Sequence, residues 1–75
     1  MELADLVVSN PNIMSGAPCF RGTRVPVALL FENLGAGMSV EEILDTWPSL
    51  ERDDVLAVLM LAGSEVERHA TRAAA

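Results

Sequence analysis

The apolar residues of this chain follow two spacings, and the change between them divides the sequence into an extended part and a helical part. Residues 6–9 and 19–23 can form two short extended segments, each beginning with apolar residues, on either side of a stretch rich in proline and glycine, which is the pattern of a hairpin. From Val27 onward the apolar residues recur every three or four positions, as on a helix that buries one face. The pattern predicts a mainly α fold, with three helices after an N-terminal β-hairpin.

The stretch from Asn10 to Val27 is expected to be an ordered loop that leads into the helices. Prolines and glycines interrupt it every few residues, yet it also carries apolar side chains that a solvated linker would not need: Ile13, Met14, Cys19, Phe20 and Val25. Residues 12–16 are the predicted hairpin tip. The apolar side chains must then pack on the helical part.

The first helix is predicted over residues 25–36. Pro26 suits its first turn, because the N–H that proline lacks has no helical partner there. Thr23 is the expected N-cap, and Gly35 or Gly37 is the expected left-handed stop.

The second helix carries the clearest local signal in the chain. Ser39 and Glu42 have the spacing of a capping box, and Met38 and Ile43 stand at the two positions of a hydrophobic staple. The helix is therefore expected to start at Ser39, and the proline after Trp47 prevents it from continuing. Its inward stripe is predicted to be Val40, Ile43, Leu44 and Trp47.

The third helix is predicted from about Glu51 and is apolar on more than one side. Its inward stripe is Val55, Val58, Leu59 and Ala62, while Leu56, Met60 and Leu61 lie off that stripe. Either hairpin residues such as Ile13 and Phe20 cover the second face, or an oligomer or partner does. If a partner covers the second face, Leu56, Met60 and Leu61 are the residues that we expect to bind it. Residues 1–63 should form one domain, and residues 64–75 a tail that extends the helix or is disordered.

The composition of the chain is rich in aliphatic residues and acidic overall. The chain has 75 residues, of which 51% are hydrophobic and only 4% aromatic, so a homodimer or higher oligomer is expected. The net charge is −6, with five arginines and no lysine, which excludes a protein that binds mainly by neutralising phosphates. The acidic start, the single cysteine and the short apolar runs predict a soluble, cytoplasmic protein with no membrane segment.

Nothing in the sequence indicates catalysis. His69 lies in the tail, and Cys19 has no histidine or acid near it in sequence, so neither is expected to be a nucleophile or base. The adjacent pairs Glu41-Glu42 and Asp53-Asp54 diverge by about 100° around a helix and do not form a metal site. We predict no enzyme activity, no cofactor, no metal and no small-molecule substrate.

Several segments together resemble domain-of-unknown-function family 433. They are Asn10-Pro11, Gly16, Pro18, the run from Arg21 to Val25, the run from Gly37 to Ile43 and the turn from Trp47 to Leu50. The resemblance covers about residues 6–62. Two positions depart from it: the family often has threonine where Glu51 stands, and lysine where Ala17 stands.

The resemblance implies a fold and a role. The fold is a helix-turn-helix-like bundle of three helices, similar to a homeodomain or winged helix, with the N-terminal hairpin. The role is that of an antitoxin in a type II toxin–antitoxin system, which binds and neutralises a PIN-like ribonuclease toxin. Weak binding of operator DNA is the further expectation. The alternative is a small homodimeric DNA-binding regulator with no nuclease partner.

The candidate nucleic-acid contacts are few. The start of the third helix would meet DNA in a helix-turn-helix, but it reads Glu51-Arg52-Asp53-Asp54, and carboxylates repel phosphates. A solvated helix start is the favoured interpretation, with Arg52 as the one base contact there. Arg21 and Arg24 at the hairpin are the other candidates. Arg24 could instead tie the hairpin to the first helix, and both interpretations stay open.

The tail gives a second partner hypothesis. Arg68 and Arg72 are four residues apart and would share a face if the tail were helical. PIN-type nucleases hold metal ions with clustered carboxylates, so an arginine-bearing segment inserted there could displace the metal. A disordered end with solvated charges is the other interpretation.

Overall fold

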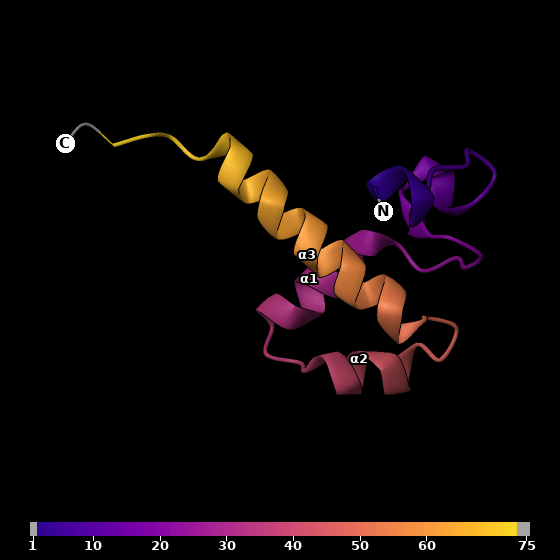
Figure 1. The fold of residues 1–75 in the computed structure, drawn as a ribbon. Helices are drawn as coiled ribbons and strands as arrows, with labels where there is room; N and C mark the ends of the chain where they lie inside the picture. Colours follow the sequence, from indigo (N-terminus) through magenta and orange to yellow (C-terminus); the bar gives the residue numbers. More distant parts are fainter. Residues whose placement is uncertain (1, 74–75) are drawn as a thin grey trace.

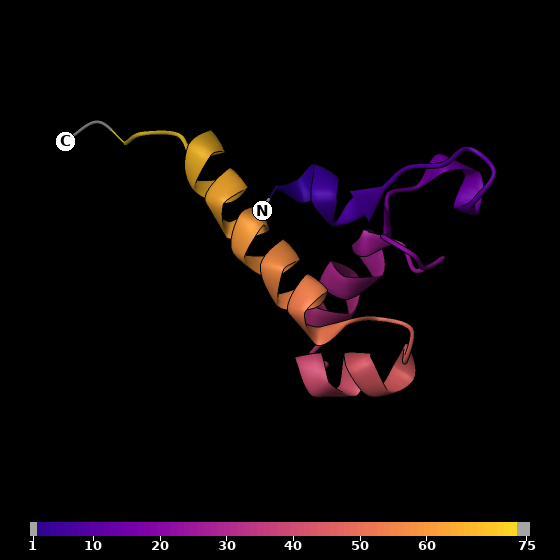
Figure 2. The ribbon, with the colours of Figure 1, turned by 45° about the vertical axis from the view of Figure 1, so that its right-hand side comes forward.

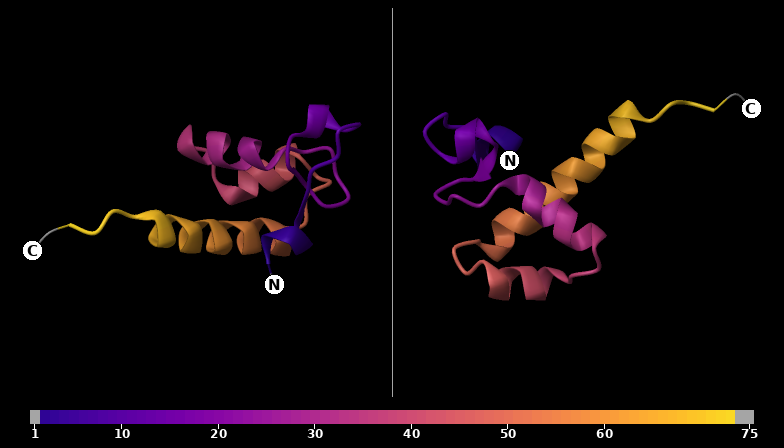
Figure 3. Two further views of the ribbon diagram at one scale, coloured as in Figure 1. Left: turned by 90° about the horizontal axis from the view of Figure 1, so that it is seen from above. Right: turned by 180° about the vertical axis from the view of Figure 1, so that it is seen from behind.

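A computed structural model describes residues 2–73 of the chain, and it confirms the predicted mainly α fold with an N-terminal hairpin (Figure 1). The elements are the 3-10 helix η1 (Leu3–Asp5), strand β1 (Val7–Val8), the 3-10 helix η2 (Met14–Gly16), strand β2 (Cys19–Phe20), and helices α1 (Val27–Gly35), α2 (Val40–Thr46) and α3 (Arg52–His69). Figure 3 shows α1 and α2 on one side of the long α3. No helix among the described residues is long and apolar enough to cross a bilayer.

The hairpin forms where the sequence predicts it, with an ordered tip. β1 and β2 are antiparallel, with Val7 opposite Phe20 and Val8 opposite Cys19. At the tip the hydroxyl of Ser9 donates to the carbonyl of Gly16 at 2.5 Å. The other edge of β2 is also occupied, because the N–H of Phe20 donates to the carbonyl of Val25 at 3.0 Å. The strand is thus held between β1 and the segment that leads into α1.

Helix α1 begins two residues later than predicted, and the expected N-cap is wrong. Pro26 is the N-cap residue. The hydroxyl of Thr23 instead accepts from the N–H of Val25 at 3.0 Å and donates to the carbonyl of Phe20 at 2.8 Å, which closes the turn after β2. Of the two glycines expected at the helix end, Gly37 is the left-handed one, with φ of +101°.

Helix α2 has the predicted capping box. The N–H of Glu42 donates to the hydroxyl of Ser39 at 3.1 Å, and the N–H of Ser39 donates back to the Glu42 carboxylate at 3.0 Å. Ile43 is fully buried, and the rest of the predicted stripe packs around it half-buried. The helix ends at Thr46, with Trp47 as its C-cap.

Helix α3 extends past residue 63, where the sequence predicted the domain to end. It begins after Glu51, whose side chain makes no capping hydrogen bond, and continues through Gly63 to His69. The helical interpretation of the tail is therefore correct as far as His69. Figure 2 shows the second half of α3 projecting beyond α1 and α2.

The core lies where the hairpin meets the three helices. Every one of these elements or their flanks contributes to it: Leu6, Phe20, Leu30, Ile43, Leu50, Val55 and Val58 are all buried. Two of them, Leu6 and Phe20, come from the hairpin region. The hairpin is therefore part of the folding unit, because two-residue strands are too short to be stable on their own.

Candidate functional site

The outward side of α3 carries large apolar side chains that stay exposed among the residues that the structure describes. Leu56 is 43% exposed and Met60 is 76% exposed, and their spacing of four residues puts them on the same face one turn apart. Leu59 is half-buried and packs against the core beside them. We call Leu56 and Met60 the outer α3 face. The hairpin does not cover it, so that interpretation is wrong for these two residues.

Leu61 does not belong to this face. It was expected with Leu56 and Met60, but it is half-buried and packs against the core. Val66, near the end of α3, is 71% exposed. It lies seven residues after Leu59, and so on the same side of the helix as Leu59. Val66 therefore lies on the side of α3 that packs on the core earlier in the helix, and it does not belong to the outer α3 face.

The acidic start of α3 is partly buried, which corrects the prediction that it is solvated. Asp54 is only 8% exposed. Its two carboxylate oxygens accept hydrogen bonds from Nε and Nη2 of Arg21, at 3.2 and 2.9 Å. The third donor, Nη1 of Arg21, reaches the carbonyl of Asp5 at 2.8 Å. The hydrogen bonds with the Asp54 carboxylate, and its negative charge, raise the pKa of Arg21 above its ordinary value. The same bonds join the hairpin to α3.

Replacing Asp54 with alanine is expected to lower the free energy of unfolding by about 1–3 kcal/mol, because a buried, doubly hydrogen-bonded carboxylate is lost. Urea unfolding followed by far-UV circular dichroism measures the change. Asp53→Ala is the matched control, since the neighbouring carboxylate is exposed. If both substitutions lower the free energy of unfolding equally, the two carboxylates stabilise only the start of the helix, and the ion pair with Arg21 contributes nothing.

A second bidentate ion pair joins α2 to α3. Nη1 and Nη2 of Arg52 donate to the two carboxylate oxygens of Glu41. The hydrogen bond with Arg52 holds the pKa of Glu41 below its usual value, and the same bond raises the pKa of Arg52. Two of the three candidate nucleic-acid contacts, Arg21 and Arg52, thus have carboxylate partners within the protein.

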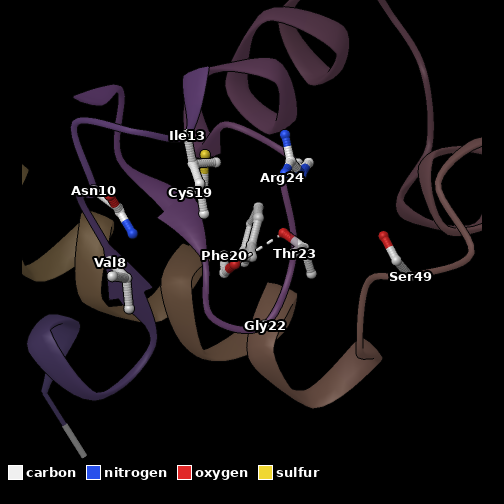
Figure 4. Close-up of a pocket in the computed structure, with 9 residues that line it drawn as sticks. All are labelled: Val8, Asn10, Ile13, Cys19, Phe20, Gly22, Thr23, Arg24 and Ser49. Carbon is white, nitrogen blue, oxygen red and sulfur yellow. Dashed lines mark hydrogen bonds between the residues drawn. The ribbon is translucent and has the colours of Figure 1, made fainter. Parts of the chain in front are cut away.

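Arg24 is the candidate without such a partner. Among residues 2–73 it forms no ion pair and no side-chain hydrogen bond. The interpretation in which Arg24 ties the hairpin to the first helix is therefore not supported. It lies at a surface pocket of about 500 Å³ beside the hairpin, which we call the hairpin pocket (Figure 4). The pocket is lined by Val8, Asn10, Ile13, Cys19, Phe20, Gly22, Thr23, Arg24 and Ser49.

The two tail arginines do not share a helical face. Arg68 lies in the last turn of α3, and its Nη1 donates to Glu65 at 2.7 Å. Arg72 lies beyond the helix, which ends at His69. This corrects the predicted pairing of Arg68 with Arg72, because only Arg68 lies in the helix.

The comparison with protein-family models assigns the chain to one family. A family model described as "Protein of unknown function (DUF433)" matches residues 7–62. The chain belongs to the DUF433 family. The match begins at β1 and ends within α3, so it includes the hairpin pocket and the outer α3 face and excludes Arg68 and Arg72.

This DUF433 chain is similar to a protein of Sinorhizobium fredii described as "Uncharacterized protein y4eO". The two are 45% identical over 51 residues, which cover 68% of this chain and 23% of the relative. The chain thus matches only about a quarter of the relative's length. No solved structure matches the chain significantly.

The capping box of this DUF433 domain makes its stability depend on pH. The hydrogen bonds from Ser39 hold the pKa of Glu42 below its ordinary 4.5. A carboxylate with a lowered pKa contributes stability that is present above its unfolded-state value and is lost as the pH falls through the folded-state value. We expect Glu42→Gln to weaken the fall of the melting temperature as the pH drops below the ordinary pKa of glutamate, because glutamine can still accept from Ser39 but cannot titrate.

Ser39→Ala is the matched variant for this pH experiment. It should lower stability by about 1 kcal/mol at neutral pH and leave the larger part of the pH dependence in place, because the N–H of Ser39 still donates to Glu42. A Glu42→Gln protein with an unchanged pH profile would contradict the role assigned to that carboxylate.

Proposed function

We propose that this DUF433 protein is an antitoxin-like module that binds and neutralises a PIN-like ribonuclease through the outer α3 face. The observation that carries the proposal is the exposure of Leu56 and Met60 on a helix whose other side is packed into the core. Exposed apolar side chains one turn apart, on a rigid helix, are typical anchors for a helix that docks in a groove of a partner.

The charges support a protein partner over nucleic acid. Arg21 and Arg52 are bidentate partners of Asp54 and Glu41, and a phosphate contact would have to compete with those carboxylates. The chain also carries a net charge of −6, which repels a polyanion. A partner protein that buries Leu56 and Met60 can bind without breaking either of these ion pairs.

The end of the chain gives the proposed mechanism of neutralisation. If the outer α3 face docks beside a carboxylate-lined metal site, the projecting end of α3 can carry Arg72 towards that site. A guanidinium placed there would bind the carboxylates and compete with the metal ion. Arg68 is held by Glu65 and contributes less in this proposal.

The test is co-expression with the product of the adjacent reading frame, followed by affinity purification and a ribonuclease assay. We expect a stable complex in which the nuclease is inactive. A variant truncated after Ala70 should still form the complex but inhibit less, because it lacks Arg72. A neighbour that is no nuclease, or a nuclease that neither co-purifies nor loses activity, would contradict the proposal.

The alternative is a homodimeric DNA-binding regulator, which the order of the helices favours. Helices α2 and α3 are joined by residues 47–51, as in a helix-turn-helix. Titrating fluorescent promoter DNA at low salt separates the two functions. Binding that needs Arg24 or Arg52 would support the regulator, and no binding by the protein alone or by its complex would remove it.

A further inference from the structure

The hairpin pocket contains polar donors that form no hydrogen bond within residues 2–73. Arg24 is unpaired among residues 2–73, and the side-chain amide of Asn10 uses only its oxygen, which accepts from the N–H of Asn12 at 2.9 Å. The NH2 of Asn10 and the hydroxyl of Ser49 make no hydrogen bond within the described chain. These donors come from three separate segments, which the fold brings to one hollow.

The rest of the pocket is apolar, and no acid lines it. In Figure 4, Asn10 and Val8 lie on one side of the hollow, Arg24 and Thr23 on the other, with Ile13 and Cys19 between them. Within the described chain none of the lining residues is a carboxylate, although the protein has 11 acidic residues and a net charge of −6. The pocket is therefore suited to one negative charge next to an apolar group.

The lining also distinguishes between kinds of anion. Phe20 is the one aromatic residue among the described lining residues, and it is only 1% exposed, so the pocket offers no ring on which a base could stack. Only one arginine is present, whereas nucleic acids are bound by several cations along the backbone. A single guanidinium is matched by a single carboxylate, which it can bind with two parallel hydrogen bonds.

We infer that the hairpin pocket binds an acidic side chain that sits beside an apolar residue in a segment of a partner protein. The carboxylate accepts from Arg24, and the apolar neighbour packs on Val8 and Ile13. This site is separate from the outer α3 face. It goes beyond the proposed neutralisation of a nuclease and does not depend on it.

The test is a nitrogen-15 NMR titration of the whole chain with the blocked dipeptide acetyl-Ile-Glu-amide, and in parallel with acetyl-Ile-Gln-amide. We expect shifts confined to amides of the pocket lining and a dissociation constant at least about tenfold lower for the glutamate probe. Equal binding of the two probes, shifts spread elsewhere or no shift at millimolar probe would each overturn the inference.

Variants and other anions sharpen the result. Arg24→Ala should abolish the preference for glutamate, and Arg24→Lys should reduce it, because lysine keeps the charge but not the paired donors. The control is Thr71→Glu, which makes the net charge more negative by the same one unit in the segment beyond α3. It should leave binding unchanged. Stronger shifts of the pocket amides with inorganic phosphate or a short single-stranded RNA would assign the pocket to a phosphate and overturn the inference.

Discussion

Substituting both Leu56 and Met60 with glutamate is expected to weaken binding of the proposed nuclease partner by about a hundredfold or more. Apolar anchors at the centre of an interface each contribute about 1–2 kcal/mol or more, and burying a carboxylate in their place adds a penalty. Glutamate is a good helix former, and both positions are exposed, so the domain should stay folded. Isothermal titration calorimetry with the purified partner measures the change in affinity.

The chain offers a matched control for this substitution. Met14 is a second exposed methionine, 53% exposed, and it lies at the hairpin tip. Met14→Glu makes the same chemical change on a different surface and should bind the partner like the wild type. An affinity that falls equally for Met14→Glu and Met60→Glu would place the effect in the overall charge and not in the outer α3 face.

Replacing Phe20 with alanine is expected to have the largest effect on stability, about 3–5 kcal/mol. Phe20 is 1% exposed and is the largest of the fully buried side chains, and it connects the hairpin to the helical core. A domain of this size is stabilised by roughly 4–11 kcal/mol in total. The variant should therefore lose a large share of that stability and unfold at a much lower urea concentration than the wild type.

Phe31→Ala is the control for the Phe20 substitution, because Phe31 is 40% exposed on α1. It removes the same side chain from the surface and should cost about 1 kcal/mol or less. Urea unfolding followed by circular dichroism compares the two variants. Similar midpoints for both would mean that the hairpin is not part of the cooperative core.

Local signals were enough to predict the hairpin and the three α-helices of this fold, but not the 3-10 helices η1 and η2. The capping box of Ser39 and Glu42 places the start of α2, and proline after Trp47 places its end. The paired extended runs predict the hairpin with Val7 and Cys19 in its strands. Such signals act within a few residues, so they are readable in one sequence. Thr23 was misplaced because its side chain can close a turn as well as cap a helix.

The contacts that define the candidate sites could not be read from the sequence. Arg21 and Asp54 are 33 positions apart, and no spacing rule joins a loop arginine to a helix start that only the fold brings near. The same holds for the hairpin pocket, since Ser49 reaches it from the turn between α2 and α3. Leu61 was assigned to the wrong side because helix periodicity alone does not say how wide a face the core covers.

The central claim is that the outer α3 face contacts the partner, and the methionines of the chain report on it directly. With carbon-13-labelled methionine methyl groups, the NMR signal of Met60 should shift or broaden when the partner nuclease is added. Met14 at the hairpin tip and half-buried Met38 should be unchanged. A complex that perturbs Met14 and leaves Met60 as it is in the free protein would contradict the account.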